Sequence, residues 1–160
     1  QAVAIGATNL LSTAIAMTVI DKLGRKTLLL TGSVGMVICL SGVATIMATG
    51  ANQHLLLWML VGFIAFFAFS QGAVIWVYIS EIFPTAVRAR GQSVGSSTHW
   101  AMCAVLTFLF PIIAEQSKAL PFVFFAAMMA LQFVVVWLYF PETKGVSLEE
   151  MDQRISVQRA

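Results

Sequence analysis

The sequence predicts an all-α protein, a bundle of helices that crosses a lipid bilayer several times. Two observations carry this prediction. Of the 160 residues, 59% are hydrophobic and only 10% are charged, whereas an ordinary soluble domain has about 25% charged residues. The charges also leave long stretches empty, namely 1–20, 27–80, 91–114 and 119–141. These features exclude a soluble enzyme, a disordered chain and a nucleic-acid binder.

Each uncharged stretch predicts at least one transmembrane helix, because a helix satisfies its own backbone hydrogen bonds in lipid and crosses it with about 20 residues. The stretch 27–80 is too long for one crossing, and the polar residues 49–54 divide it. Pro121 suits the first turn of the last helix, and Pro141 ends it. A β-barrel is excluded because stretches such as 123–140 are apolar on every side. The five predicted spans, all within residues 1–141, are 2–20, 27–48, 55–80, 91–114 and 120–140.

The basic residues predict the orientation of the spans, since lysine and arginine concentrate in cytoplasmic loops. Eight of the nine basic residues lie on one side of the five spans, which is therefore the cytoplasmic side. The C-terminal tail, residues 142–160, is expected on that side, and the Ser147–Glu150 capping pattern predicts a short amphipathic helix over 148–157. The eight residues are Lys22, Arg25, Lys26, Arg88, Arg90, Lys144, Arg154 and Arg159.

The start of the sequence predicts that the chain is part of a longer protein. Gln1 is not an initiator methionine, and no signal peptide precedes the first apolar stretch. An odd number of spans that starts outside the cell agrees with a missing N-terminal part.

Several side chains within the spans could line a cavity at mid-membrane depth. Trp76 lies well inside the third span, where its indole N–H needs a polar partner, and Gly72 weakens the helix before it. His99 and Trp100 lie in the fourth span, and Asn9 lies in the first. Amides and histidine offer donors and acceptors to sugar hydroxyls, and an indole face packs on a sugar ring. The same side chains could instead form hydrogen bonds between helices, and the residues alone leave both interpretations open.

The sequence indicates no catalytic set and no metal site. Cys39 and Cys103 fall in apolar stretches and are interpreted as small packing residues. No nucleophile–base pair and no cofactor motif are visible. The turn at Asp21–Lys26 has the charges of an ordinary cytoplasmic loop, whereas Glu81, at the end of a span, should be paired with a basic residue.

Four motifs in the same order resemble the C-terminal part of the sugar porters of the major facilitator superfamily. The resemblance covers nearly the whole chain, and four motifs at these spacings are highly specific. They are the turn Asp21-Lys22-Leu23-Gly24-Arg25-Lys26, the stretch from Gly72 to Trp76, the stretch Ser80-Glu81-Ile82-Phe83-Pro84 with Arg88 seven residues after Glu81, and Pro141-Glu142-Thr143-Lys144-Gly145.

The resemblance implies that the five spans are the last five of twelve, in the C-terminal six-helix half of a major facilitator fold. It implies transport of a monosaccharide by alternating access. Sugar contacts are implied for Trp76, Gly72 and Asn9, and also for His99 and Trp100, which fall where the family has Gln-Trp or Asn-Trp. Histidine at this position and alanine in place of the family's proline at Ala73 are departures from the pattern. A charged network that closes the inner gate is implied for Asp21, Gly24, Arg25, Lys26, Glu81, Arg88 and Glu142.

The resulting hypothesis is a monosaccharide transporter of the plasma (inner) membrane, whose partners are the sugar, the bilayer and the N-terminal half of the same protein. The alternatives are a transporter-like sugar sensor and a truncated, non-transporting remnant. No enzyme activity, cofactor or nucleic acid is expected. The identity of the sugar, and proton symport against facilitated diffusion, stay open at this point.

Overall fold

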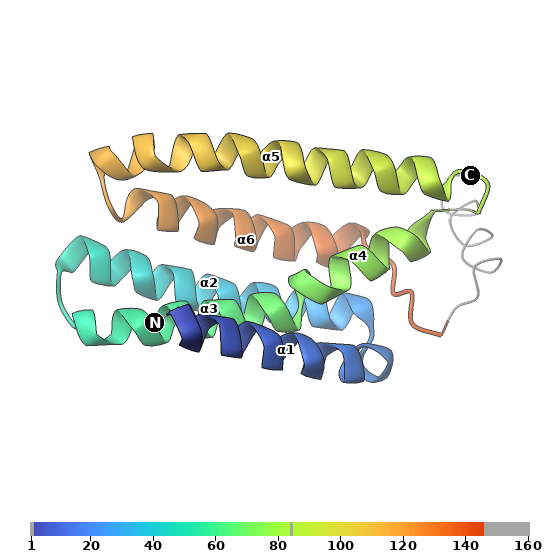
Figure 1. Cartoon of the computed structure of the whole chain (residues 1–160), viewed down its shortest axis with the longest axis horizontal. Helices are drawn as coiled ribbons and strands as arrows, with labels where there is room; N and C mark the ends of the chain where they lie inside the picture. The colour runs from blue at the N-terminus through green and yellow to red at the C-terminus, as the bar shows by residue number, and fades with distance from the viewer. Residues whose placement is uncertain (1, 84, 146–160) are drawn as a thin grey trace.

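The computed structural model describes residues 2–83 and 85–145, and all regular structure in these ranges is helical, which confirms the predicted all-α class (Figure 1). Four helical stretches are long and apolar enough to cross a membrane, namely Arg25–Thr49, Gln53–Ile82, Arg88–Gln116 and Leu120–Tyr139. The amphipathic helix predicted over 148–157 lies outside the described residues. The elements are α1 (Ala2–Leu23), α2 (Arg25–Thr49), the 3-10 turn η1 (Gln53–Leu55), α3 (Leu56–Phe69), α4 (Gln71–Ile82), α5 (Arg88–Gln116) and α6 (Leu120–Tyr139).

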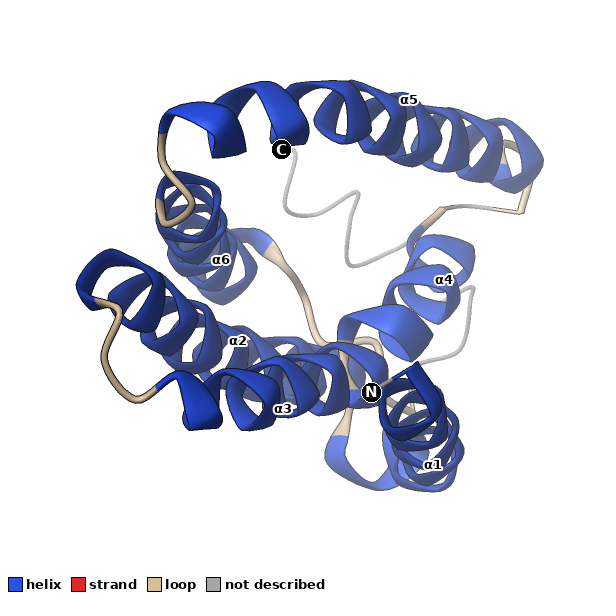
Figure 2. Cartoon of the chain, turned by 60° about the vertical axis from the view of Figure 1, so that its left-hand side comes forward, coloured by secondary structure: helices blue, strands red, loops and turns tan. Residues whose placement is uncertain are grey.

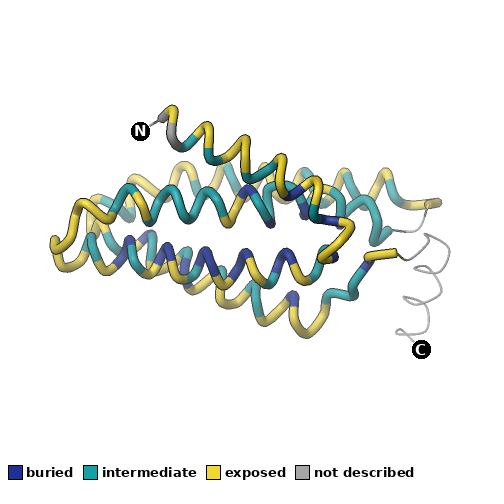
Figure 3. Tube along the Cα trace, turned by 90° about the horizontal axis from the view of Figure 1, so that it is seen from below, coloured by how far each residue is buried: buried dark blue, intermediate teal, exposed yellow. Residues whose placement is uncertain are grey.

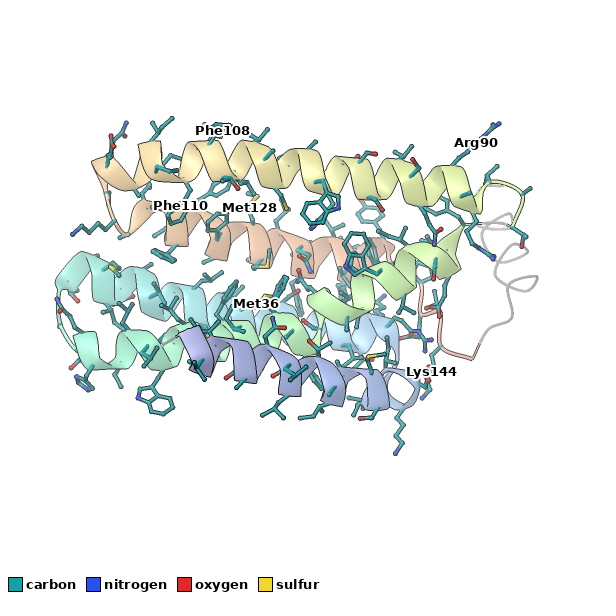
Figure 4. All side chains as sticks on the ribbon, in the orientation of Figure 1. Met36, Arg90, Phe108, Phe110, Met128 and Lys144 are labelled. Carbon is teal, nitrogen blue, oxygen red and sulfur yellow. The ribbon has the colours of Figure 1, made fainter. Side chains whose placement is uncertain are left out.

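One end of the bundle collects most of the described charges. The α1–α2 turn, the start of α5 and the segment 140–145 meet there, and we call this the charged end (Figure 1). Arg90 and Lys144 both lie at this end (Figure 4). At the opposite end Gly50 takes a left-handed conformation with φ 68° and closes α2, before η1 begins.

Helix α2 is the most buried element. It contacts α1, α3, α4 and α6, and its buried positions recur along one side (Figure 3). Helix α5 has no buried residue, and it contacts α4 and α6 at the edge of the bundle (Figure 2). The exposed apolar side chains of α5, such as Phe108, are expected to face lipid or further helices. The buried core joins four helices through Ile20, Leu28, Leu29, Val74 and Val136.

The third predicted span consists of two helices that meet at Ser70. This residue has φ −114° and ψ −85°, which is not helical, and its hydroxyl donates to the Phe66 carbonyl at 2.7 Å. Ser70 is fully buried and packs directly against Gly32 of α2, where any Cβ would overlap the serine hydroxyl. The sequence placed the weak point of this helix at Gly72. The break lies two residues earlier, at Ser70, where Gly32 lets α2 approach closely.

A polar link joins α2 and α6 within the apolar interior. The Gln132 amide donates to the Ser33 hydroxyl at 3.2 Å, and that hydroxyl donates to the Leu29 carbonyl at 2.8 Å. Ser33 is fully buried. The Gln132 side chain therefore forms a hydrogen bond between two helices.

Replacing Gln132 with leucine is expected to destabilise the bundle modestly. Hydrogen bonds between membrane helices contribute about 0.6 kcal/mol on average, so we expect a loss of about that size. Thermal denaturation in detergent measures it. The control is Gln116→Leu, because Gln116 is exposed at the end of α5. Equal melting temperatures for the two variants would show that the link contributes nothing.

Candidate functional site

Arg25 is the centre of a charged cluster at the charged end. Its Nη2 and Nε donate to the two carboxylate oxygens of Glu81 at 2.8 and 3.1 Å, so α2 and α4 are joined by a two-pronged ion pair. Its Nη1 contacts Asp21 at 3.0 Å. The Arg25 side chain is 11% exposed and that of Glu81 is 24% exposed, whereas Asp21 is 77% exposed. The Glu81 pair is therefore the stronger one, since water screens the pair with Asp21.

Glu142 caps the first turn of α2 from the far end of the chain. Its carboxylate accepts hydrogen bonds from the backbone N–H groups of Arg25 at 2.8 Å and Lys26 at 3.1 Å. A helix leaves its first N–H groups without partners inside the helix, and its dipole favours a negative charge there. Gly24, which has no side chain, lets the Glu142 carboxylate approach the start of α2. Its φ is 89°, and a Cβ on it would lie 2.5 Å from Glu142 Oε2.

Thr143 connects the two carboxylates of the cluster. Its hydroxyl donates to Glu81 Oε2 at 2.7 Å, and its own N–H donates to Glu142 Oε1 at 3.0 Å. Lys144 donates its N–H to the same Glu142 oxygen at 3.1 Å and its Nζ to the carbonyl of Lys22 at 2.5 Å. Hydrogen bonds therefore join the segment 140–145 to the α1–α2 turn. We call Asp21, Arg25, Glu81, Glu142 and Thr143 the charged cluster.

Two basic residues of the implied gate network, Arg88 and Lys26, lie outside the charged cluster. Arg88, which the resemblance placed in the network, donates to the Phe83 carbonyl and the Thr85 hydroxyl, each at 3.3 Å. Lys26 donates its Nζ to the Trp137 carbonyl at 2.9 Å and joins the network only through its N–H.

Sequence reasoning missed two participants at this end. Thr143 lies in the motif that ends the last span, but only its neighbour Glu142 was assigned a role. Tyr78 is 2% exposed, stacks on the Phe140 ring at 4.9 Å and donates its hydroxyl to the Pro141 carbonyl at 3.3 Å. The only sequence feature that could have pointed to Tyr78 is its position between two residues that were assigned a role, Trp76 and Glu81.

Deeper in the bundle, three of the predicted sugar-contacting residues form one ring group. The His99 imidazole meets the Trp76 indole at 5.3 Å and the Trp100 indole at 5.4 Å, both edge to face. Trp76 comes from α4 and the other two from α5. His99 lies eleven residues after the start of α5 at Arg88, which corresponds to about 16 Å along the helix. Trp76 is 41% and Trp100 is 66% exposed, so indole surface is available to a ligand.

The other two predicted contacts do not join the ring group. Gly72 lies one turn before Trp76, against Phe67, and Asn9 is exposed on α1. A cavity of about 200 Å³ lies elsewhere, beside Met36 near the middle of the bundle (Figure 4). Its lining is apolar except for Gln71, whose amide contacts the Met129 sulfur at 3.8 Å. Because no member of the ring group lines this cavity, it is not the predicted sugar site.

Comparison with known proteins identifies the family. The model of the family described as "Sugar (and other) transporter" matches residues 1–154. The chain belongs to the sugar transporter family of the major facilitator superfamily. This family consists of transporters and not of enzymes, as predicted from the sequence.

Relatives in the sugar transporter family match almost all of this chain. The D-xylose-proton symporter of Escherichia coli (strain K12) is 31% identical over 159 residues, which are 95% of this chain and 32% of the symporter. The glucose transporter GlcP of Staphylococcus epidermidis is 36% identical over 159 residues, 96% of this chain and 35% of GlcP. The inward-open structure of the E. coli xylose transporter XylE superposes with a TM-score of 0.89 at 32% identity, over 94% of this chain and 34% of XylE. The chain therefore spans about a third of the length of these relatives.

Proposed function

We propose that this chain forms five helices of the C-terminal half of a monosaccharide transporter, which works by alternating access in the plasma (inner) membrane. The observation that carries the proposal is the ring group. Two exposed indoles flank an imidazole at a depth of about 16 Å from the charged end, and indole faces pack on the apolar face of a sugar ring. Asn9 and Gly72 belong to the same proposed site, where the N-terminal half would complete the enclosure.

The proposed orientation has the charged end, and with it the C-terminus, in the cytoplasm. Lysine and arginine side chains at the charged end support this. There the charged cluster, together with Gly24, Lys26 and Arg88, would close the inner side of the transport path. Relatives named for xylose and for glucose support a monosaccharide as the class of cargo. Protons are the co-substrate of the first of these relatives by name, which makes symport the coupling to test first.

Uptake of labelled monosaccharides into vesicles that contain the whole protein tests the proposal. Trp76→Ala is expected to lower uptake about tenfold or more, the equivalent of about 1.4 kcal/mol, because it removes one of the two indole surfaces of the site. The matched control is Trp58→Ala, which removes the same side chain from α3. Trp58 is 68% exposed and lies outside the ring group. His99→Ala is expected to act in the same direction as Trp76→Ala.

Four outcomes separate the candidate functions. Loss of uptake with Trp76→Ala but not with Trp58→Ala supports the transporter and its site. Equal uptake in both variants and the unaltered protein refutes the assignment of the ring group. Saturable sugar binding without uptake or exchange would favour a sensor, and neither binding nor uptake would favour a non-transporting remnant.

A further inference from the structure

Besides the two indoles, His99 has a partner that sugar contact does not explain. Cys103 lies four residues further along α5, and its Sγ is 3.7 Å from His99 Nε2. Residues four apart share one face of a helix, so the thiol and the imidazole stand side by side. Cys103 is partly exposed, unlike the buried Cys39 in α2.

We propose that His99 and Cys103 form a binding site for a soft divalent cation, with zinc as the first candidate. Zinc holds a cysteine sulfur at about 2.3 Å and a histidine nitrogen at about 2.0 Å, so a tetrahedral ion sets the two ligand atoms about 3.5 Å apart. The observed separation of 3.7 Å already fits this geometry. Both ligands can therefore reach one ion without a change of helix conformation.

The surroundings favour binding by this pair. The Trp76 and Trp100 rings pack against the imidazole at 5.3 and 5.4 Å, with interplanar angles of 81° and 76°, and so restrict its movement. On binding, the Cys103 thiol gives its proton to water and the thiolate bonds to the ion, while neutral imidazole donates the lone pair of Nε2. A thiolate and an imidazole select zinc or cadmium over magnesium or calcium, which prefer oxygen ligands.

The site has two protein ligands. Within residues 2–83 and 85–145, no group of three or more histidine, cysteine, aspartate and glutamate side chains could hold a metal ion. Water would fill the remaining coordination positions, as in open zinc sites. Binding is therefore reversible. An ion at this position lies on the imidazole beside Trp76, and, on the basis of the proposed function, it inhibits sugar uptake.

The test measures protection of the Cys103 thiol, which needs no transport. Maleimide labelling of the whole protein in membrane vesicles is followed in a Cys39→Ala background, or residue by residue by mass spectrometry of the unaltered protein. Zinc chloride is expected to slow the labelling of Cys103 about tenfold or more, because a metal-bound thiolate does not react. In His99→Gln the labelling rates with and without zinc are expected to agree within about twofold.

The matched control moves the thiol off the shared face. In the double variant C103A/A104C the thiol lies one residue further on, about 100° around the helix from the position next to His99. Zinc is expected to leave its labelling unchanged. Inhibition of sugar uptake by zinc, lost in Cys103→Ala, is a separate measurement whose failure would concern the sugar site alone.

Three results would overturn the proposal. Zinc could leave the labelling of Cys103 unchanged although maleimide reacts. It could slow the labelling equally with and without His99, which would mean that His99 is not a ligand. Cys103 could also fail to react with maleimide in every variant, and a hydrated cation would then have no route to it.

Discussion

Glu142→Ala is expected to lower the free energy of unfolding by about 3 kcal/mol, since hydrogen bonds to a charged group contribute about 1.5–3 kcal/mol each but are not additive. The substitution removes the acceptor of four backbone N–H groups, those of Arg25, Lys26, Thr143 and Lys144. Two of these groups form the open first turn of α2, which Gly24 cannot cap with a side chain. Thermal or denaturant unfolding in detergent measures the change.

Two controls accompany this variant. Glu142→Gln keeps one acceptor oxygen and loses the charge, so about half of the effect is expected. Glu115→Ala removes an exposed glutamate of α5 and should change the free energy of unfolding by less than about 0.5 kcal/mol. If Glu142→Ala were no more harmful than Glu115→Ala, the hydrogen bonds of Glu142 would not stabilise the charged end.

The second large effect is expected at the ion pair between Arg25 and Glu81. A double-mutant cycle with Arg25→Ala and Glu81→Ala should give a coupling energy of about 2 kcal/mol, because the pair is two-pronged and largely shielded from water. The same cycle for Arg25 and Asp21 should give less than about 1 kcal/mol, because Asp21 is exposed. Equal coupling energies for both pairs would contradict this ranking.

The proposed role of the charged cluster as a gate needs a different readout. Arg25→Ala should speed the labelling of a cysteine introduced as Ile82→Cys, a partly buried position at the end of α4, in a background without the native cysteines. A membrane-impermeant reagent is applied to the side of the charged end. Unchanged labelling would leave the ion pair as a stabilising contact and would refute the gate.

The positions of most helices could be predicted from the sequence because the features that mark them are local. Uncharged stretches and two prolines define most helix ends to within a few residues. The break at Ser70 could not be located in this way. It depends on Gly32, 38 positions earlier, and on the close contact that this glycine allows between α2 and the end of α3.

The charged end was only partly predictable for the same reason. Glu81 was expected to be paired, but its partner Arg25 lies 56 residues away, and local charge patterns suggested an ordinary loop. The resemblance supplied that pair, and it also included Arg88. The Arg88 guanidinium instead donates to Phe83 and Thr85, which lie five and three residues before it in the chain. Thr143 and Tyr78 were missed because their partners are far along the chain.

The cap on α2 has a consequence for biosynthesis. The N–H of Arg25 and the carboxylate of Glu142 are separated by 117 positions, so the first turn of α2 must wait for its cap until four further helices have been synthesised. Until then a nascent chain exposes unpaired N–H groups at the start of α2, near a Glu81 carboxylate that lacks its hydrogen bond from Thr143. Completion of the segment 140–145 is the moment when that end closes. A chain truncated before Pro141 should therefore remain open to proteases at the α1–α2 turn, and a chain that continues past Gly145 should not.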